Sequence, residues 1–127
     1  MKIKLVAHKD VPVLVISEDI PAEKIPVLKA GLKNLLCTGK DRIILDLSGV
    51  QSLAAEAVIE VGRFHALATE LSGRIVLVSS SPEVVRIIAE AHVSSLMPVL
   101  TSLDEAVDVL RQSTKAQAEE DIDGVRL

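Results

Sequence analysis

Short apolar runs alternate along this chain with longer segments of helical periodicity, and this alternation restricts the possible folds more than any other feature. The apolar runs have the length of strands, and most of the segments between them are long enough to form helices. Strands that are joined through helices become parallel neighbours in one sheet. The sequence therefore predicts an α/β domain, with strands near residues 2–7, 11–17, 42–48, 74–80 and 96–100.

The two N-terminal strands should form a hairpin, because only HKD at residues 8–10 separates them. Pro12 has no amide hydrogen to donate, so it should lie at the start or edge of its strand. Pro21 is suited to the first turn of a helix that runs to about Cys37 and ends at Gly39. A second helix should end at Gly73. The expected buried stripes are Ile25, Leu28, Leu32, Leu35 and Leu36 in the first helix, and Val58, Val61, Phe64 or His65, Ala68 and Leu71 in the second.

Two further helices are predicted towards the C-terminus. Ser81 is the expected cap of the third helix, which begins at Pro82. Ser102 and Glu105 have the spacing of a capping box for the fourth. We expect one domain over residues 1–112, followed at 113–127 by a charged and flexible tail that has little to bury.

Composition excludes several classes of function. The formal net charge is −4 and the 14 basic residues are dispersed, which argues against nucleic-acid binding. Phe64 is the only aromatic residue and should pack in the core, as should the single cysteine, Cys37. No apolar run is long enough to cross a membrane, and the N-terminus lacks the hydrophobic core of a signal peptide, so we expect a cytoplasmic protein.

Candidate catalytic groups are few, and no enzyme, cofactor or metal site is expected. Asp46 and Ser48 end a predicted strand but have no base or metal ligand beside them, so they are expected to be structural. Ser79–Ser81 could hold a small anion at a helix start, although a cap requires a serine there in any case. The histidines show no metal-ligand spacing and are expected to be surface or packing residues; they are His8, His65 and His92.

Three blocks of the chain resemble the STAS domain of anti-sigma factor antagonists. They read IILDLSGVQSL at 43–53, GRIVLVSSSPEVVRII at 73–88 and LTSLDEAVDVL at 100–110, in the order and spacing of that family. The resemblance covers about residues 3–112. It implies a mixed sheet of about four or five strands, with about four helices packed mainly on one face. It also implies a non-enzymatic, bacterial-type signalling module that binds a protein partner, either an anti-sigma or switch-kinase-like factor or a subunit of a stress complex.

The same family contains domains with other partners, so two alternatives stay open. The chain could be an accessory STAS subunit of a lipid ABC transporter, bound to the ATPase subunit. It could also be a domain that senses a nucleotide or another small anion near Ser79–Ser81. Self-association is common among STAS domains, but no exposed seam in the sequence requires it.

The phosphorylation switch that is usual in this family has no acceptor here. In the family, the loop after the LSGV-like strand usually reads Asp-Ser-Ser/Thr-Gly, and a partner kinase phosphorylates the second hydroxyl residue to abolish binding. Placed without gaps, the motif falls on Ala54, Ala55, Glu56 and Ala57. A shift of one residue moves the acceptor position to Ala55. Neither placement supplies a hydroxyl group, and the nearest one belongs to Ser52.

Glu56 has two interpretations. A phosphorylated residue would place a charge of about −1.5 to −2 near the positive end of the helix dipole, and Glu56 places one negative charge there permanently. It either imitates the phosphorylated state or is an ordinary acid of a first helical turn, which is the simpler interpretation. The expected partner surface is the turn at 50–58 with the exposed face of the following helix, and comprises Ser52, Ala54, Ala55, Glu56, Ala57, Glu60 and Arg63.

Overall fold

A five-stranded sheet forms the centre of the computed structural model, which describes residues 3–91 and 97–111. The strands are β1 (Ile3–His8), β2 (Val11–Ile16), β3 (Arg42–Asp46), β4 (Arg74–Val78) and β5 (Val99–Leu100). They lie in the order β1-β2-β3-β4-β5. Only β1 runs antiparallel to its neighbour, and all other pairs are parallel. The prediction of an α/β domain with a mixed sheet is therefore confirmed.

The hairpin between β1 and β2 closes through a two-residue turn. Lys9 and Asp10 have positive φ values of 51° and 67°, which match the twist of a tight hairpin. His8 already belongs to β1, so the turn is one residue shorter than the predicted HKD. Pro12 is the second residue of β2 and precedes the first residue of β2 that pairs with β3, Val13. Its missing amide hydrogen therefore costs no bond to that central neighbour.

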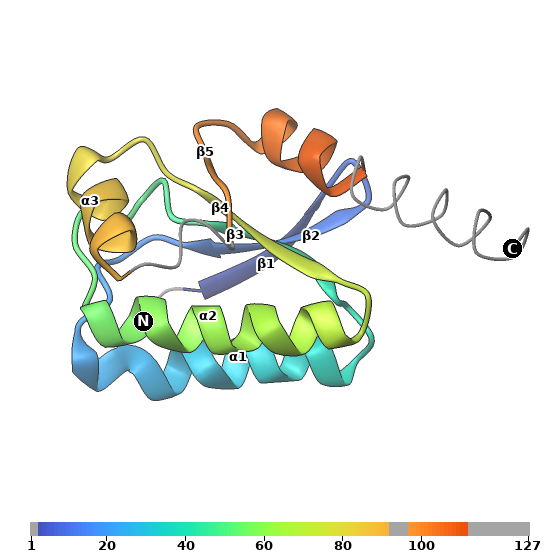
Figure 1. Cartoon of the computed structure of the whole chain (residues 1–127), viewed down its shortest axis with the longest axis horizontal. Helices are drawn as coiled ribbons and strands as arrows, with labels where there is room; N and C mark the ends of the chain where they lie inside the picture. Colours follow the sequence, from blue (N-terminus) through green and yellow to red (C-terminus); the bar gives the residue numbers. More distant parts are fainter. Residues whose placement is uncertain (1–2, 92–96, 112–127) are drawn as a thin grey trace, which may run out of the picture.

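Helices cover both faces of the sheet (Figure 1). They are α1 (Ile25–Cys37), α2 (Ala55–Glu70), α3 (Pro82–Glu90) and a further helix at residues 103–111. The buried residues of α1, α2 and α3 share one core with alternate residues of the sheet, such as Ile43 and Leu45. The helix at 103–111 packs on the opposite face, where Leu110 joins Ile44 and Val76. The expected arrangement, with most of the helices on one face, is thus confirmed.

Three predictions at helix ends were wrong. Pro21 precedes a short 3₁₀ helix (Ala22–Lys24), and α1 begins only at Ile25. Cys37 is exposed, because it is about 200° around the helix from the buried Leu35. Leu71 is 55% exposed, because it lies beyond the last residue of α2, where the chain turns back towards the sheet. The other residues of both stripes are buried or partly buried, including Phe64 and His65.

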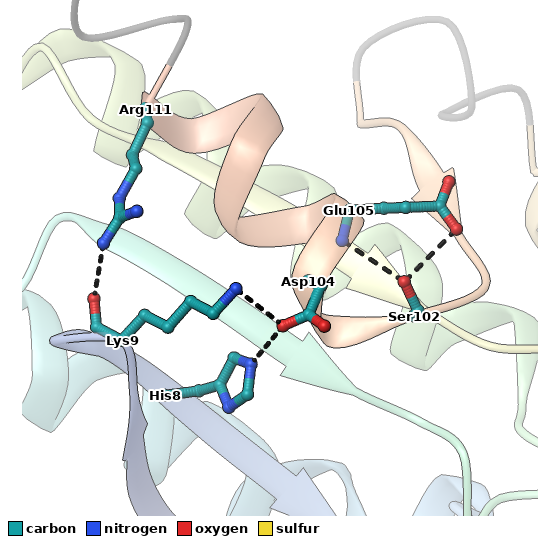
Figure 2. Close-up of polar contacts among 6 residues, drawn as sticks. All are labelled: His8, Lys9, Ser102, Asp104, Glu105 and Arg111. Atoms are coloured by element: carbon teal, nitrogen blue, oxygen red, sulfur yellow. Dashed lines mark hydrogen bonds and ion pairs between the residues drawn. The ribbon is translucent and has the colours of Figure 1, made fainter.

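Polar contacts fasten the hairpin turn to the last helix (Figure 2). His8 Nε2 lies 2.8 Å and Lys9 Nζ 3.1 Å from Asp104 Oδ1, and these hydrogen bonds, that of His8 above all, hold the pKa of Asp104 below its usual value. Arg111 Nη2 donates to the Lys9 carbonyl oxygen over 3.1 Å. Because Asp104 is largely exposed, each ion pair contributes little stability. His8 therefore has a structural role at the surface, as predicted.

The last helix begins at the predicted capping residues (Figure 2). Glu105 N–H donates to Ser102 Oγ, and Ser102 Oγ in turn donates to Glu105 Oε1, both over 3.2 Å. The predicted tail at 113–127 and His92 lie outside the described residues.

His65 is the buried polar residue of α2, with 6% of its surface exposed. Its Nδ1 accepts a hydrogen bond from Ile75 N–H at the start of β4, over 3.1 Å. Burial lowers the pKa of His65, and the positive charge of Arg74 lowers it further. The neutral ring thus ties α2 to the sheet, which agrees with its predicted packing role.

Candidate functional site

The loop between β3 and α2 is held in place by the connection that follows β2. Asp19 Oδ1 accepts hydrogen bonds from the backbone N–H groups of Gln51 and Ser52, over 2.8 and 3.1 Å. Ile20 N–H donates to the Ser52 carbonyl oxygen over 3.1 Å, and Ala54 N–H donates to the Ile20 carbonyl oxygen over 2.7 Å. These four bonds fix the backbone of the predicted partner surface.

Apolar anchors support the same loop from the inside. Val50 is fully buried and Leu53 is 6% exposed. Gly49 passes so close to the β2 connection that a Cβ atom at this position would lie 3.1 Å from Ser17 Cα. The loop therefore presents Ser52 to solvent from a backbone that is tied down on both sides.

The start of α2 contains the four positions on which the family's phosphorylation motif was expected to fall. Ala54 is the N-cap residue, with ψ of 143° and no side-chain hydrogen bond to the helix. Ala55 and Glu56 are exposed, whereas Ala57 is fully buried and Ala54 is half-buried. Among these four positions, Ala55 and Glu56 are therefore the ones whose side chains a partner could reach freely.

Further along α2, one exposed face continues from this turn. Ala55, Ile59 and Arg63 are spaced four residues apart and are all exposed. Glu60 is largely shielded and accepts a hydrogen bond from Arg63 Nη1 over 2.8 Å, while Lys29 of α1 lies 3.8 Å away. The carboxylate of Glu60 is thus already paired, and Glu56 provides the exposed negative charge of this face.

Two residues of this candidate site could not be identified from the sequence. Asp19 lies 32 residues before Gln51, and only the fold brings them together. Ile59 is 45% exposed, and as a large apolar residue beside Glu56 it is suited to contact with a protein. In the sequence, the exposure of Ile59 is indicated only by its position outside the buried stripe that contains Val58 and Val61.

The serines after β4 line a shallow polar groove beside the loop. Ser79 is buried, and its Oγ accepts a hydrogen bond from Ser81 N–H over 3.2 Å. Ser81 is the N-cap of α3, as predicted, but its hydroxyl makes no capping bond. The groove has a volume of about 580 Å³ and also includes Glu83, whose carboxylate is paired with Arg86. Asp46 Oδ1 accepts from Ser48 N–H over 2.9 Å, which is a structural role.

Over residues 3–91 and 97–111, no three His, Cys, Asp or Glu side chains are grouped to hold a metal ion. Over the same residues, no helix is long and apolar enough to cross a membrane. What the site offers is an anchored loop and an exposed helix face.

The sheet order, the covering helices and this loop define an α/β domain of the STAS type. The chain belongs to the STAS domain family: the family model described as "Mlab, STAS domain" matches residues 3–101. A sequence comparison with curated proteins finds no match.

Solved structures of anti-sigma factor antagonists have the same fold. A candidate anti-sigma factor antagonist from Thermotoga maritima is 20% identical, with a TM-score of 0.79 over 86% of this chain and 94% of that one. An anti-sigma factor antagonist from Mycobacterium paratuberculosis is also 20% identical, with a TM-score of 0.79 over 87% and 93%. A STAS domain protein from Planctomyces limnophilus is 17% identical, with a TM-score of 0.76 over 86% and 97%. At these identities the likeness establishes the fold.

Proposed function

We propose that this chain is a non-enzymatic, cytoplasmic interaction module that binds a regulatory protein through the turn at 50–58 and the exposed face of α2. The observation that carries the proposal is the anchored loop, which presents Glu56 in the first turn of α2, where the family usually has a hydroxyl group. Unlike a phosphate, the carboxylate of Glu56 is neither added by a kinase nor removed by a phosphatase. Partner binding is therefore not switched by phosphorylation on this loop.

The helix start supports the gapless placement of the family motif. That placement puts the aspartate of the motif on Ala54, which is the N-cap of α2. Aspartate is among the favoured N-cap residues, because its side chain accepts hydrogen bonds from the first free N–H groups. The acceptor hydroxyl of the motif then corresponds to Glu56. Its negative charge beside the positive end of α2 is a permanent substitute for part of the phosphate charge.

Phosphosite mapping tests the absence of the switch. After incubation with a kinase that co-purifies with the partner, we expect no phosphate on residues 48–58 that changes partner binding. The double variant Ala55→Ser/Glu56→Ser is the positive control, since it restores hydroxyl groups at both candidate positions. Phosphate on Ser48 or Ser52 of the natural chain, coupled to release of the partner, would overturn the proposal.

Charge reversal at Glu56 tests the surface itself. Glu56→Arg should weaken the partner complex about tenfold, through repulsion and lost complementarity, as measured by calorimetry. The fold should tolerate the change, because Glu56 is exposed. Asp108→Arg is the matched control, because Asp108 is also exposed and its helix covers the opposite face of the sheet. Equal affinity of both variants would exclude this surface.

A second candidate function is that of an accessory STAS subunit of a lipid ABC transporter. The missing acceptor hydroxyl favours it, because a constitutive subunit needs no phosphorylation switch. A pull-down from source extract separates the two functions: a membrane ATPase would support the transporter subunit, and a sigma-factor regulator or stress-complex protein would support the regulator. Nucleotide or small-anion sensing has less support, since no lysine or arginine is among the described residues that line the serine groove.

A further inference from the structure

An open apolar groove lies between the C-terminal ends of α1 and α2, at the other end of α2 from Glu56. Figure 1 shows α1 and α2 side by side and running in the same direction, so both helices end at this groove. It has a volume of about 340 Å³, and its apolar lining comprises Leu36, Cys37, Phe64, Leu67 and Leu71. We call this surface the α1/α2 groove.

Three of the five apolar residues that line the α1/α2 groove are exposed to solvent. Leu67 is 48% exposed and Leu71 is 55% exposed, and they are one helical turn apart, so they form one ridge. Cys37 is exposed as well. Single exposed apolar residues are common on protein surfaces, but several that line one groove indicate a contact with another molecule.

Opposite charges border the same groove. Lys33 of α1 and Glu70 of α2 both line it, and both are exposed. In the described part of the chain, neither makes an ion pair within the molecule. In a two-fold interface, a contact between one residue of the first copy and another residue of the second copy is repeated with the copies exchanged. The groove is therefore complementary to a copy of itself in charge as well as in apolar character.

We propose that the α1/α2 groove is the interface of a homodimer. The Leu67 and Leu71 ridge of each copy packs into the groove of the other, and Lys33 of each copy pairs with the partner's Glu70. The inference does not depend on the proposed regulator site. Glu56 and Glu70 are 14 positions apart along α2, which corresponds to about 21 Å at 1.5 Å per residue. Dimerisation thus leaves the loop at 50–58 and the first turn of α2 accessible in both copies, whereas Arg63 is one turn from Leu67.

Sedimentation velocity of the full chain over a range of concentrations tests the dimer. The natural chain should associate as a dimer, and Leu67→Gln should raise its dissociation constant about tenfold, since it removes buried apolar contact. Leu5→Gln is the matched control, because Leu5 is 50% exposed on β1 and should leave the dimer unchanged. Circular dichroism confirms that each variant is folded.

A charge swap tests the geometry of the interface. Glu70→Lys should weaken the dimer about tenfold, because it opposes Lys33 with a like charge. The double variant Lys33→Glu/Glu70→Lys should restore it, because every pair is again of opposite sign. A natural chain that stays monomeric, including one whose groove binds a different protein, would overturn the proposal. So would a dimer that Leu67→Gln does not weaken, or a double variant that does not regain affinity.

Discussion

Replacing Gly73 by alanine should destabilise the domain by about 3 kcal/mol, because overpacking against rigid backbone cannot be relieved by a rotamer change. A Cβ atom at position 73 would overlap the carbonyl oxygen of Asp41 and lie 2.6 Å from its carbonyl carbon. The same carbonyl accepts the hydrogen bond of Arg74 N–H over 2.8 Å, where β3 and β4 begin side by side. Moving the two segments apart would lengthen that bond.

Urea unfolding measures this loss, and Gly31→Ala is the matched control. Gly31 lies inside α1, and its nearest neighbour outside the helix backbone, a methyl carbon of Leu14, would be 3.8 Å from an added Cβ. This is an ordinary contact, so the higher helix propensity of alanine should stabilise the domain by about 0.5–1 kcal/mol. The two substitutions should therefore have opposite signs. A loss below about 1 kcal/mol for Gly73→Ala would show that the packing is looser than described.

His65→Ala should cost about 3 kcal/mol, because it leaves the buried Ile75 N–H without its acceptor and creates a cavity beside it. His65→Asn should cost less, since the amide oxygen can accept the same hydrogen bond. Thermal or urea unfolding at neutral pH measures both. If the two variants were equally stable, the 3.1 Å bond from Ile75 N–H to His65 Nδ1 would not contribute to stability.

The same histidine should make stability depend on pH. Burial and Arg74 lower the pKa of His65 in the folded state, so between the two pKa values the unfolded chain binds more protons. The neutral ring of His65 contributes its full share to the stability of the folded state above the unfolded pKa of about 6.5. This stability is lost as the pH falls towards the pKa of His65 in the folded state. The pKa of Asp104 is lowered from 3.8, so the stability that its charge contributes is lost only below about pH 3.8, well outside the range in which His65 acts. The natural chain should therefore lose more stability than His65→Asn below about pH 6.5.

Most of the fold could be predicted from the sequence, because each strand and each helix buries one face. Burial of one face gives apolar residues a period of about 2 in a strand and of about 3.6 in a helix. Ile43, Leu45 and Ile44 divide between the two faces of the sheet as alternation requires. Leu28 and Leu32 of α1 are both buried, because residues four positions apart lie on the same face of a helix. Helix ends were less predictable, because the periodicity of a stripe does not show where the covered surface stops.

The candidate site was predictable only in its position along the chain. The flanking blocks located the turn at 50–58, but its anchor, Asp19, comes from a distant connection, and such a hydrogen bond leaves no periodic signal. The burial of Ala57 and the exposure of Ile59 depend on how α2 is rotated against the sheet. The α1/α2 groove depends on the two helices ending side by side, so Cys37 and Leu71 were both expected in the core.

A quantitative pull-down from source extract tests directly whether a regulatory protein binds at Glu56. The natural chain, Glu56→Arg and Asp108→Arg serve as baits at equal concentration, and mass spectrometry measures each captured protein. We expect a regulatory protein that the natural chain and Asp108→Arg retain equally and that Glu56→Arg retains about tenfold less. Equal capture of that protein by all three baits would contradict the proposed surface.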